Sequence, residues 1–500
     1  MTRASGVLLP ISSLANAEGI GSLGKSAYQF VDFLAAAGQS YWQILPLGPT
    51  SYGDSPYQSF SAFAGNTNFI DLKTLVDWSL IEADDYQGID WGNNPEQIDY
   101  AKIFYHKRPI LEKAVASFLE QADSDPDYLT FIQDNQDWLQ PFAEFMAVKE
   151  YYDLSPISDW PEAIRLRDGE AVKAILTQEK NSLNYHYVSQ YFFFKQWFAL
   201  KDYANQKGIY LIGDIPIYVA SDSVEVWQTP HFFKLDQSGQ PQVVAGCPPD
   251  AFSSDGQLWG NPIYDWETMA KDNYQWWIKR IQASLKLYDM VRIDHFRGFE
   301  AYWEIPASAP TAASGKWVKG PGLDLFQAIK EALGSVNIIA ENLGFLTQEV
   351  ADLLEVTGFP GMHVMQFGFS GEDSSDLPHN FNKNSVAYVG THDNQTALGW
   401  YLGQDAASRY YIDAYCGRQK AESVAEMLNR TLAASCSQTV IYTMQDLLNL
   451  DDQARINTPS TLGGNWQWRM SATALTYSLV KNLYSLTRLY HRLPIVKNFP

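Results

Sequence analysis

The chain has 500 residues, of which 46% are hydrophobic and 14% aromatic, and its 57 acidic and 36 basic side chains leave a formal net charge of −21. The apolar content excludes an intrinsically disordered chain, and the negative charge argues against nucleic acid or membrane partners, because both attract cationic surfaces. Cys247, Cys416 and Cys436 show no C-x-x-C spacing, so we expect no disulfide framework, no metal site and a reducing, cytoplasmic location.

The N-terminal segment imitates a signal peptide, but its apolar stretch is too broken to be one. Arg3 precedes an apolar run and an A-x-A triplet, yet Pro10, Ser12 and Ser13 interrupt that run. The uncharged stretch 33–53 is long enough to span a membrane but contains glutamine and proline residues. We therefore predict that the first segment forms a strand and that neither stretch enters a membrane.

Short apolar runs rich in β-forming residues recur along the chain, and amphipathic stretches separate most of them. Such runs are typical of parallel strands that are buried on both faces. We predict an α/β fold, a (β/α)8 TIM barrel, although a doubly wound sheet would produce nearly the same alternation. The predicted strands are 7–10, 42–46, 209–214, 290–294, 337–341, 363–367, 386–390 and 440–443, and predicted helices include 26–37, 323–333, 348–355 and 421–433.

Two gaps between the predicted strands are too long for ordinary βα connections, since they span about 160 and about 75 residues. We interpret 71–195 as a mainly helical insertion subdomain and 220–286 as a second insertion, both near the carboxyl-end face of one catalytic barrel that comprises residues 1–500. Residues 71–190 carry 23 acidic and 10 basic side chains, which we assign to a solvated face. Helical spacing in this insertion predicts one apolar face formed by Ile103, Phe104, Ile110, Leu111, Ala114, Val115, Phe118 and Leu119.

A glycine motif near the N-terminus matches the dinucleotide-binding fingerprint in letters but not in context. Gly19, Gly21 and Gly24 lie nearly ten residues after the first predicted strand, and no acidic residue closes the next strand. A tight turn before a helix is the favoured interpretation, and a titration with NAD would test the oxidoreductase alternative. The segment 123–134 begins like a calcium loop but lacks its glycine and glutamate. We expect no cofactor.

Acidic residues lie where three of the predicted strands end. Asp294 and Glu341 close their strands, and Asp393 falls just past a third. A single acid in such a place is more often a helix cap, but the carboxyl ends of barrel strands share the face on which active sites are built. A carboxylate pair on one face is typical of glycosyl transfer. Arg292, on the same face of the strand as Asp294, would favour the ionised form of a nucleophile.

The surroundings of these acids suggest which catalytic role each of them would have. Burial of Glu341 would help it to keep a proton near neutral pH, as a general acid must. Asp393 could stabilise positive charge on the sugar. His295 and His392 could donate hydrogen bonds to sugar hydroxyls, although a single histidine is more often a packing residue.

Longer motifs accompany the acids, and the most specific is the loop 246–262. Others lie at 53–59, 64–66, 213–219, 292–298, 340–344, 377–380, 391–394 and 463–469. With these motifs the chain resembles, nearly from end to end, the 4-α-glucanotransferases of glycoside hydrolase family 77, the amylomaltases and disproportionating enzymes. Asn342, Gln395 and the 367–371 stretch depart from the family pattern, which bears on subsite affinity and preferred chain length.

The resemblance implies that a segment of an α-1,4-glucan, such as a maltodextrin or maltooligosaccharide, is transferred to the 4-hydroxyl of another glucan or of glucose by a retaining double displacement. It implies that Asp294 is the nucleophile, Glu341 the general acid/base and Asp393 the transition-state stabiliser. It further implies that sugar is contacted around the cleavage point by Tyr57, Asp214, Arg292, His295 and His392. The loop 246–262 would be a flap that covers the glucan through Asp250, Gln257 and Trp259, and stacking platforms further out would be formed by Tyr100 and Trp466. Further substrate contacts are expected from Ser59 and Asn465.

Other functions remain open from the sequence. A retaining α-glucan hydrolase uses the same three acids, because carboxylates do not determine whether water or a sugar is the acceptor. A non-catalytic glucan-binding protein on the same barrel is a further alternative. We expect a monomer or a weak homo-oligomer.

Overall fold

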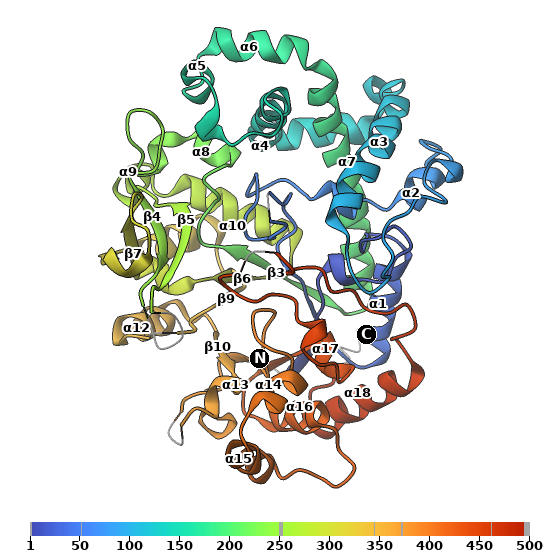
Figure 1. The fold of residues 1–500 in the computed structure, drawn as a ribbon, viewed down its shortest axis with the longest axis vertical. Coiled ribbons are helices and arrows are strands. Elements are labelled where there is room, and N and C mark those ends of the chain that lie inside the picture. Colours follow the sequence, from blue (N-terminus) through green and yellow to red (C-terminus); the bar gives the residue numbers. More distant parts are fainter. Residues whose placement is uncertain are drawn as a thin grey trace.

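A parallel sheet of eight strands forms the centre of the computed structural model, which describes residues 3–51, 53–249, 254–344, 346–371, 374–461 and 463–494 (Figure 1). The strand order is β10-β11-β12-β1-β2-β3-β6-β9, and every neighbouring pair is parallel. The two end strands also meet, because Ala340 N donates to Pro360 O (2.9 Å) and Met362 N donates to Asn342 Oδ1 (2.6 Å). The predicted (β/α)8 TIM barrel is confirmed, and the doubly wound alternative is wrong.

Each barrel strand overlaps one of the predicted runs. The prediction for 363–367 is only partly right, because the strand ends at Val364 and Met365 begins a short helix. The strands are β1 (Ala4–Leu8), β2 (Tyr41–Gln43), β3 (Tyr210–Pro216), β6 (Met290–Asp294), β9 (Ile338–Ala340), β10 (Gly361–Val364), β11 (Ser385–Tyr388) and β12 (Thr439–Thr443).

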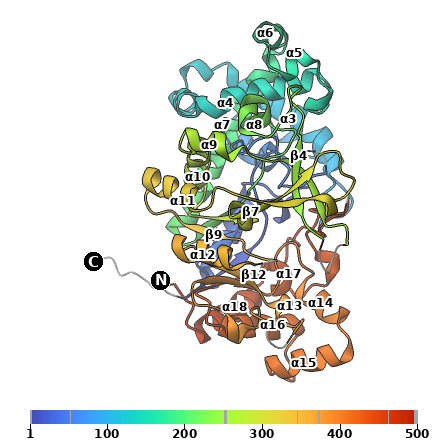
Figure 2. The ribbon, with the colours of Figure 1, turned by 90° about the vertical axis from the view of Figure 1, so that its left-hand side faces the viewer.

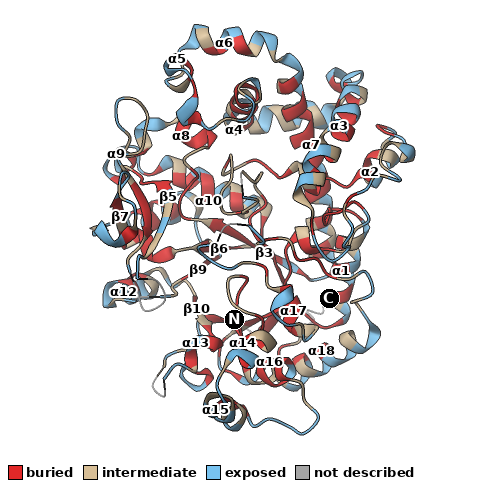
Figure 3. Ribbon diagram, in the orientation of Figure 1, coloured by how far each residue is buried: buried red, intermediate tan, exposed pale blue. Residues whose placement is uncertain are grey.

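Helices cover the outside of the barrel and turn their buried faces toward the strands (Figure 3). In α1, the buried Ala27, Phe30, Val31 and Leu34 follow the spacing of an apolar stripe. The helices around the barrel are α1 (Lys25–Ala36), α7 (Lys180–Gln206), α10 (Gln275–Leu287), α11 (Leu323–Leu333), α12 (Gln348–Thr357), α13 (Met365–Gly368), α14 (Ala397–Gly403), α15 (Ala406–Cys416), α16 (Val424–Ala434), α17 (Met444–Leu447) and α18 (Tyr477–Leu489). No helix in the described parts of the chain is both long and apolar enough to cross a membrane.

The chain between β2 and α7 is helical and lies beyond the carboxyl ends of the strands, at the top of Figure 1. The predicted apolar face of α3 is wrong at two positions, because Phe104 is 59% and Leu119 37% exposed. Lys107 is buried instead, with its ammonium on Glu18 (3.3 Å) and on the carbonyl of Asn68 (2.7 Å), so a charged residue lies within the inward stripe. The helices are α2 (Leu72–Asp77), α3 (Tyr100–Leu119), α4 (Pro126–Tyr151), α5 (Glu162–Arg165) and α6 (Gly169–Gln178).

A second, antiparallel sheet of four strands lies beside the barrel, in the order β5-β4-β7-β8 (Figure 2). The sequence did not predict it, because two of its strands follow β6 and lie outside the predicted insertion. Its elements are β4 (Val243–Cys247), β5 (Gln257–Pro262), β7 (Ala301–Pro306) and β8 (Lys316–Lys319), with α8 (Val224–Gln228) and α9 (Trp266–Lys271) nearby in sequence. The predicted covering loop 246–262 is a loop only in part, because it begins in β4 and its last six residues form β5; Asp250 lies outside the described residues.

Candidate active site

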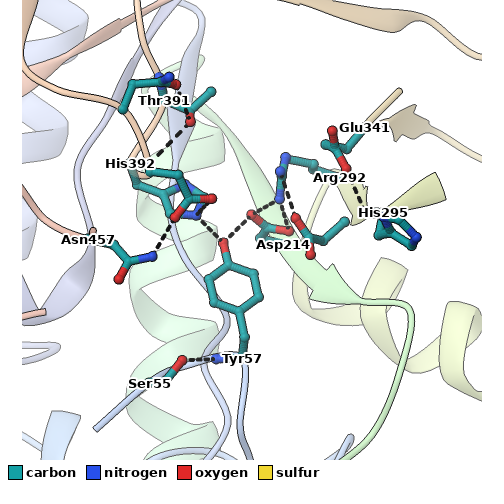
Figure 4. Close-up of polar contacts among 12 residues, drawn as sticks. Ser55, Tyr57, Asp214, Arg292, His295, Glu341, Thr391, His392 and Asn457 are labelled. Atoms are coloured by element: carbon teal, nitrogen blue, oxygen red, sulfur yellow. Dashed lines mark hydrogen bonds and ion pairs between the residues drawn. The ribbon is translucent and has the colours of Figure 1, made fainter. Parts of the chain in front are cut away.

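The acids predicted from the strand ends lie together at the carboxyl end of the barrel, and Figure 4 labels one of them, Glu341, near Asp214 and Arg292. Asp294 is the last residue of β6, Glu341 directly follows β9, and Asp393 lies in the loop between β11 and α14. Asp214 lies within β3, which pairs directly with β6. The barrel topology therefore brings together side chains that are up to 179 positions apart in the sequence.

Glu341 lies directly beside the nucleophile predicted at the end of β6. Its Oε2 accepts a hydrogen bond from the backbone N–H of His295 (2.7 Å), the residue after Asp294, and its Oε1 accepts one from Leu343 N–H (2.8 Å). Burial raises the pKa of Glu341 to about 7, with a further contribution from Asp294 that Arg292 opposes. A carboxyl group with this pKa can donate and accept a proton near neutral pH.

Arg292 joins two carboxylates in the floor of the site. Its Nη1 donates to both oxygens of Asp214 (2.8 and 2.7 Å), and its Nη2 donates to Oδ1 of Asp294 (2.9 Å). Burial alone would lower the pKa of Arg292, but Asp214 and Asp294 raise it well above its ordinary value. The guanidinium is therefore permanently charged, and its charge-assisted hydrogen bonds orient both carboxylates.

Tyr57 connects Asp214 with the loop that carries Asp393. Its hydroxyl lies 2.9 Å from Oδ2 of Asp214 and 2.8 Å from Nε2 of His392, and its ring stacks on the imidazole at 5.4 Å. Because Asp214 already accepts from Arg292, we infer that it is ionised and that Tyr57 donates to it. His392 then donates from Nε2. Its buried Nδ1 has no partner among the described residues.

His295 directly follows β6 and carries a second imidazole, whose Nε2 is shielded from solvent. Its backbone is left-handed (φ 54°), which suits the sharp turn after Asp294. Burial lowers the pKa of His295 to about 4, so the ring is neutral at physiological pH. The ring packs edge-on against Trp259 at 4.8 Å.

Asp393 is held by two residues that the sequence did not predict. Asn457 Nδ2 donates to Asp393 Oδ1 (2.6 Å), and Arg455 Nη2 donates to the backbone carbonyl of Asp393 (2.7 Å). Asn457 also donates its backbone N–H to the carbonyl of His392 (3.1 Å). Both residues follow β12, whose loop must open on the same face as the other strand ends, and this topological signal could have pointed to them.

The outer predicted residues differ in what their side chains contact. Trp466 lies 5.8 Å from the ring of Tyr57, and its carbonyl accepts from the hydroxyl of Tyr100 (2.8 Å). In β5, Trp259 Nε1 donates to Oε1 of Gln257 (3.1 Å). These contacts place aromatic rings along the wall of the site, where they can stack on apolar sugar faces.

Ser59 and Asn465 instead support their own loops. The Ser59 hydroxyl lies within hydrogen-bond distance of the carbonyls of Pro49 (2.9 Å) and Ser61 (2.8 Å). Asn465 accepts from Thr458 N–H (2.9 Å). No group of three or more His, Cys, Asp or Glu side chains in the described part of the chain is arranged to hold a metal ion.

Comparisons with known proteins identify the family of the chain. The model of the 4-alpha-glucanotransferase family matches residues 9–475. The 4-alpha-glucanotransferase of Streptococcus pneumoniae is 58% identical over 494 residues, which cover 98% of each chain, and that of Thermus thermophilus is 44% identical over 480 residues, which cover 94% of this chain and 95% of the relative. The structure of the amylomaltase from Streptococcus agalactiae in complex with acarbose superposes with a TM-score of 0.97 at 49% identity, covering 98% of this chain and 100% of that one. The chain belongs to the 4-alpha-glucanotransferase family.

Proposed function

We propose that this protein transfers a segment of an α-1,4-glucan to the 4-hydroxyl of a second glucan or of glucose, with retention at the anomeric carbon. The observation that carries the proposal is the position of Glu341. A buried carboxyl group with a pKa of about 7 accepts from the peptide N–H that directly follows Asp294. One carboxyl group poised for proton transfer beside a second carboxylate is the equipment of a reaction at a glycosidic bond.

In the first step Asp294 attacks the anomeric carbon of the donor while Glu341 protonates the glycosidic oxygen. The bond between that carbon and oxygen breaks, the reducing-end part of the glucan leaves, and a covalent ester joins the remaining glucosyl segment to Asp294. Positive charge develops on the sugar ring in the transition state, and the carboxylate of Asp393 stabilises it.

In the second step the 4-hydroxyl of the acceptor gives its proton to the ionised Glu341. The acceptor oxygen displaces Asp294, and two inversions produce net retention. This scheme requires the two carboxyl groups to lie ~5–5.5 Å apart, whereas inverting enzymes separate them by ~6.5–9.5 Å. Transfer exceeds hydrolysis when a bound sugar excludes water, a task that we assign to the aromatic wall around Trp259 and Trp466.

The products of maltotriose distinguish transfer from hydrolysis. We expect a ladder of longer maltooligosaccharides together with glucose, measured by chromatography, and no ladder with the Asp294→Asn variant. Production of only glucose and maltose would instead indicate the hydrolase. An Asp294→Asn variant with full activity would remove the nucleophile from the scheme and reopen the possibility of a non-catalytic barrel.

We further propose that the protein acts in the cytoplasm as a monomer or weak homo-oligomer.

A further inference from the structure

The loop that carries Asp393 is only partly supported by its own residues. Asn394 Oδ1 accepts hydrogen bonds from the backbone N–H and the hydroxyl of Thr391 (2.9 Å each), which closes the first turn of the loop. From Gln395 to the start of α14 at Ala397, Gln366 Nε2 donates to the carbonyl of Gln395 (2.9 Å), and the other contacts from outside the loop and α14 come from the segment after β12. The position of Asp393 therefore depends on partners outside its own loop.

Two carboxylates from the segment after β12 hold this second half of the loop. Asp446, in α17, accepts from the backbone N–H of Ala397 (2.7 Å). Asp452 accepts from the backbone N–H of Thr396 (3.0 Å) and from Nε2 of Gln395 (2.5 Å). The three donors belong to consecutive residues that begin two positions after Asp393.

The two carboxylates differ in their access to water. Asp446 is 3% exposed and Ala397 is fully buried, whereas Asp452 is exposed. Water can replace the carboxylate of Asp452, but it cannot reach the N–H of Ala397, which would remain unpaired without Asp446. Burial raises the pKa of Asp446 to about 6, opposed by the N–H of Ala397 and the hydroxyl of Thr443. Strongly perturbed groups of this kind cluster near functional sites.

The same segment also contacts Asp393 directly through Asn457 and Arg455, so both halves of the loop rest on residues 446–457. We propose that Asp446 is a positioning residue for glucan transfer: by fixing the first N–H of α14, it sets the orientation of the Asp393 carboxylate. This inference rests on the role proposed for Asp393 in the reaction. Asp446 touches neither sugar nor reacting atoms.

The Asp446→Ala variant tests this role through its turnover. We expect kcat for transfer from maltotriose to fall about 10- to 100-fold while KM changes less than twofold, since a small misplacement of a reacting group costs up to about 100-fold. The Asp446→Asn variant retains an oxygen that accepts from Ala397, so its kcat should recover to within about threefold of wild type. The Asp452→Ala variant should lose less than the Asp446→Ala variant.

A second variant tests the same hydrogen bond by removing its donor, the backbone N–H of Ala397. Ala397 is the first residue of α14, where proline is well tolerated, and Thr396 already has extended backbone (φ −58°, ψ 155°) that suits a following proline. The Ala397→Pro variant therefore removes the N–H, and the ring carbon that replaces the hydrogen also displaces the Asp446 carboxylate, which lies 2.7 Å from this nitrogen. We expect the same selective loss of kcat, and an unchanged kcat in this folded variant would overturn the proposal.

A matched control separates positioning from general stability. Asp71 is also a buried aspartate that caps a short helix, since it accepts from Thr74 N–H (2.8 Å) at the start of α2. The Asp71→Ala variant should lower the thermal midpoint as much as Asp446→Ala does, but leave kcat at 25 °C unchanged. Equal losses of kcat in both variants would indicate a purely structural role.

Combination with Asp393→Asn completes the test. If Asp446 acts through Asp393, the Asp446→Ala change should reduce the residual activity of Asp393→Asn by less than twofold. A full tenfold reduction in that background would contradict the proposal. Failure of the wild type to produce longer glucans would instead refute the proposed function. A wild type that transfers, with Asp446→Ala as fast, would refute only the positioning role.

Discussion

The hydroxyl of Tyr57 connects Asp214, in the barrel, with the loop that carries Asp393. It bridges Asp214 and His392, while the Tyr57 ring stacks on the imidazole independently of that hydroxyl. The Tyr57→Phe variant should therefore keep the stacking and lose the bridge. We expect kcat/KM on maltotriose to fall about 10- to 100-fold, because hydrogen bonds to charged groups contribute roughly 1.5–3 kcal/mol.

Tyr442 provides the matched control for this variant. It is a buried barrel tyrosine whose hydroxyl has no hydrogen-bond partner among the described residues. The Tyr442→Phe variant should keep wild-type kcat/KM and lose no thermal stability. Parallel losses in both variants would mean that removal of any buried hydroxyl disturbs the barrel, and that the bridge has no particular role.

The protonation of Glu341 should control the pH dependence of transfer. Burial raises its pKa from 4.5 to about 7, so the free enzyme holds the catalytic proton below that pH and loses it above. The general acid must be protonated in the first step, and kcat/KM should therefore fall tenfold per pH unit above about pH 7. A profile that stays flat from pH 6 to pH 9 would contradict the assignment of Glu341 as the acid.

At the scale of single elements, β3 depends on a glycine beside one of its functional residues. A Cβ atom at Gly213 would lie 2.1 Å from the ring of Tyr288, and Asp214 is the next residue along the strand. The Gly213→Ala variant must displace the ring or the strand. We expect a loss of about 1–3 kcal/mol in the free energy of unfolding, measured in urea, together with lower activity because Asp214 moves.

Gly169, the first residue of α6, is the control for this substitution. A Cβ atom there would contact nothing within 4 Å. The Gly169→Ala variant should be neutral or slightly more stable, since alanine reduces the entropy of the unfolded chain. Equal destabilisation by both substitutions would argue against the steric explanation for Gly213.

At the scale of the whole molecule, Arg492 ties the two ends of the chain together. Its fully buried guanidinium donates to the carbonyls of Ala4 in β1 (3.1 Å), Ala433 in α16 (2.9 Å), and Ser435 and Ser437 just before β12 (3.1 Å each). Replacement by methionine would leave these buried carbonyls with fewer donors.

We expect Arg492→Met to lower the free energy of unfolding by about 2–4 kcal/mol and to leave kcat at 25 °C nearly unchanged. The exposed Arg488, in the last turn of α18, is the matched control, and Arg488→Met should shift the thermal midpoint little. If the two variants unfold at the same temperature, Arg492 does not hold the chain ends together.

The amino-acid sequence predicts the buried parallel strands, the helices between them and the three acids at the strand ends, whereas closure of the sheet into a barrel became certain only in the structure. Buried parallel strands leave continuous apolar runs, and the carboxyl ends of such strands must share one face, so Asp294, Glu341 and Asp393 could be placed together without knowledge of any contact. Arg292 was predictable for the same reason, because it lies two residues from Asp294 on the same strand face. These features follow from the spacing of residues within short segments, which can be read directly from the amino-acid sequence.

The contacts that support the acids became visible only in the folded chain. Asn457 and Arg455 hold Asp393 from the loop after β12, and no local pattern marks them as its partners. The antiparallel sheet pairs strands that precede β6 in the sequence with strands that follow it. Lys107 is buried, although the helical spacing predicted that Phe104 would be buried instead. These contacts join residues far apart in the chain, and their free energies depend on packing and desolvation, which arise only once the barrel has brought the segments together.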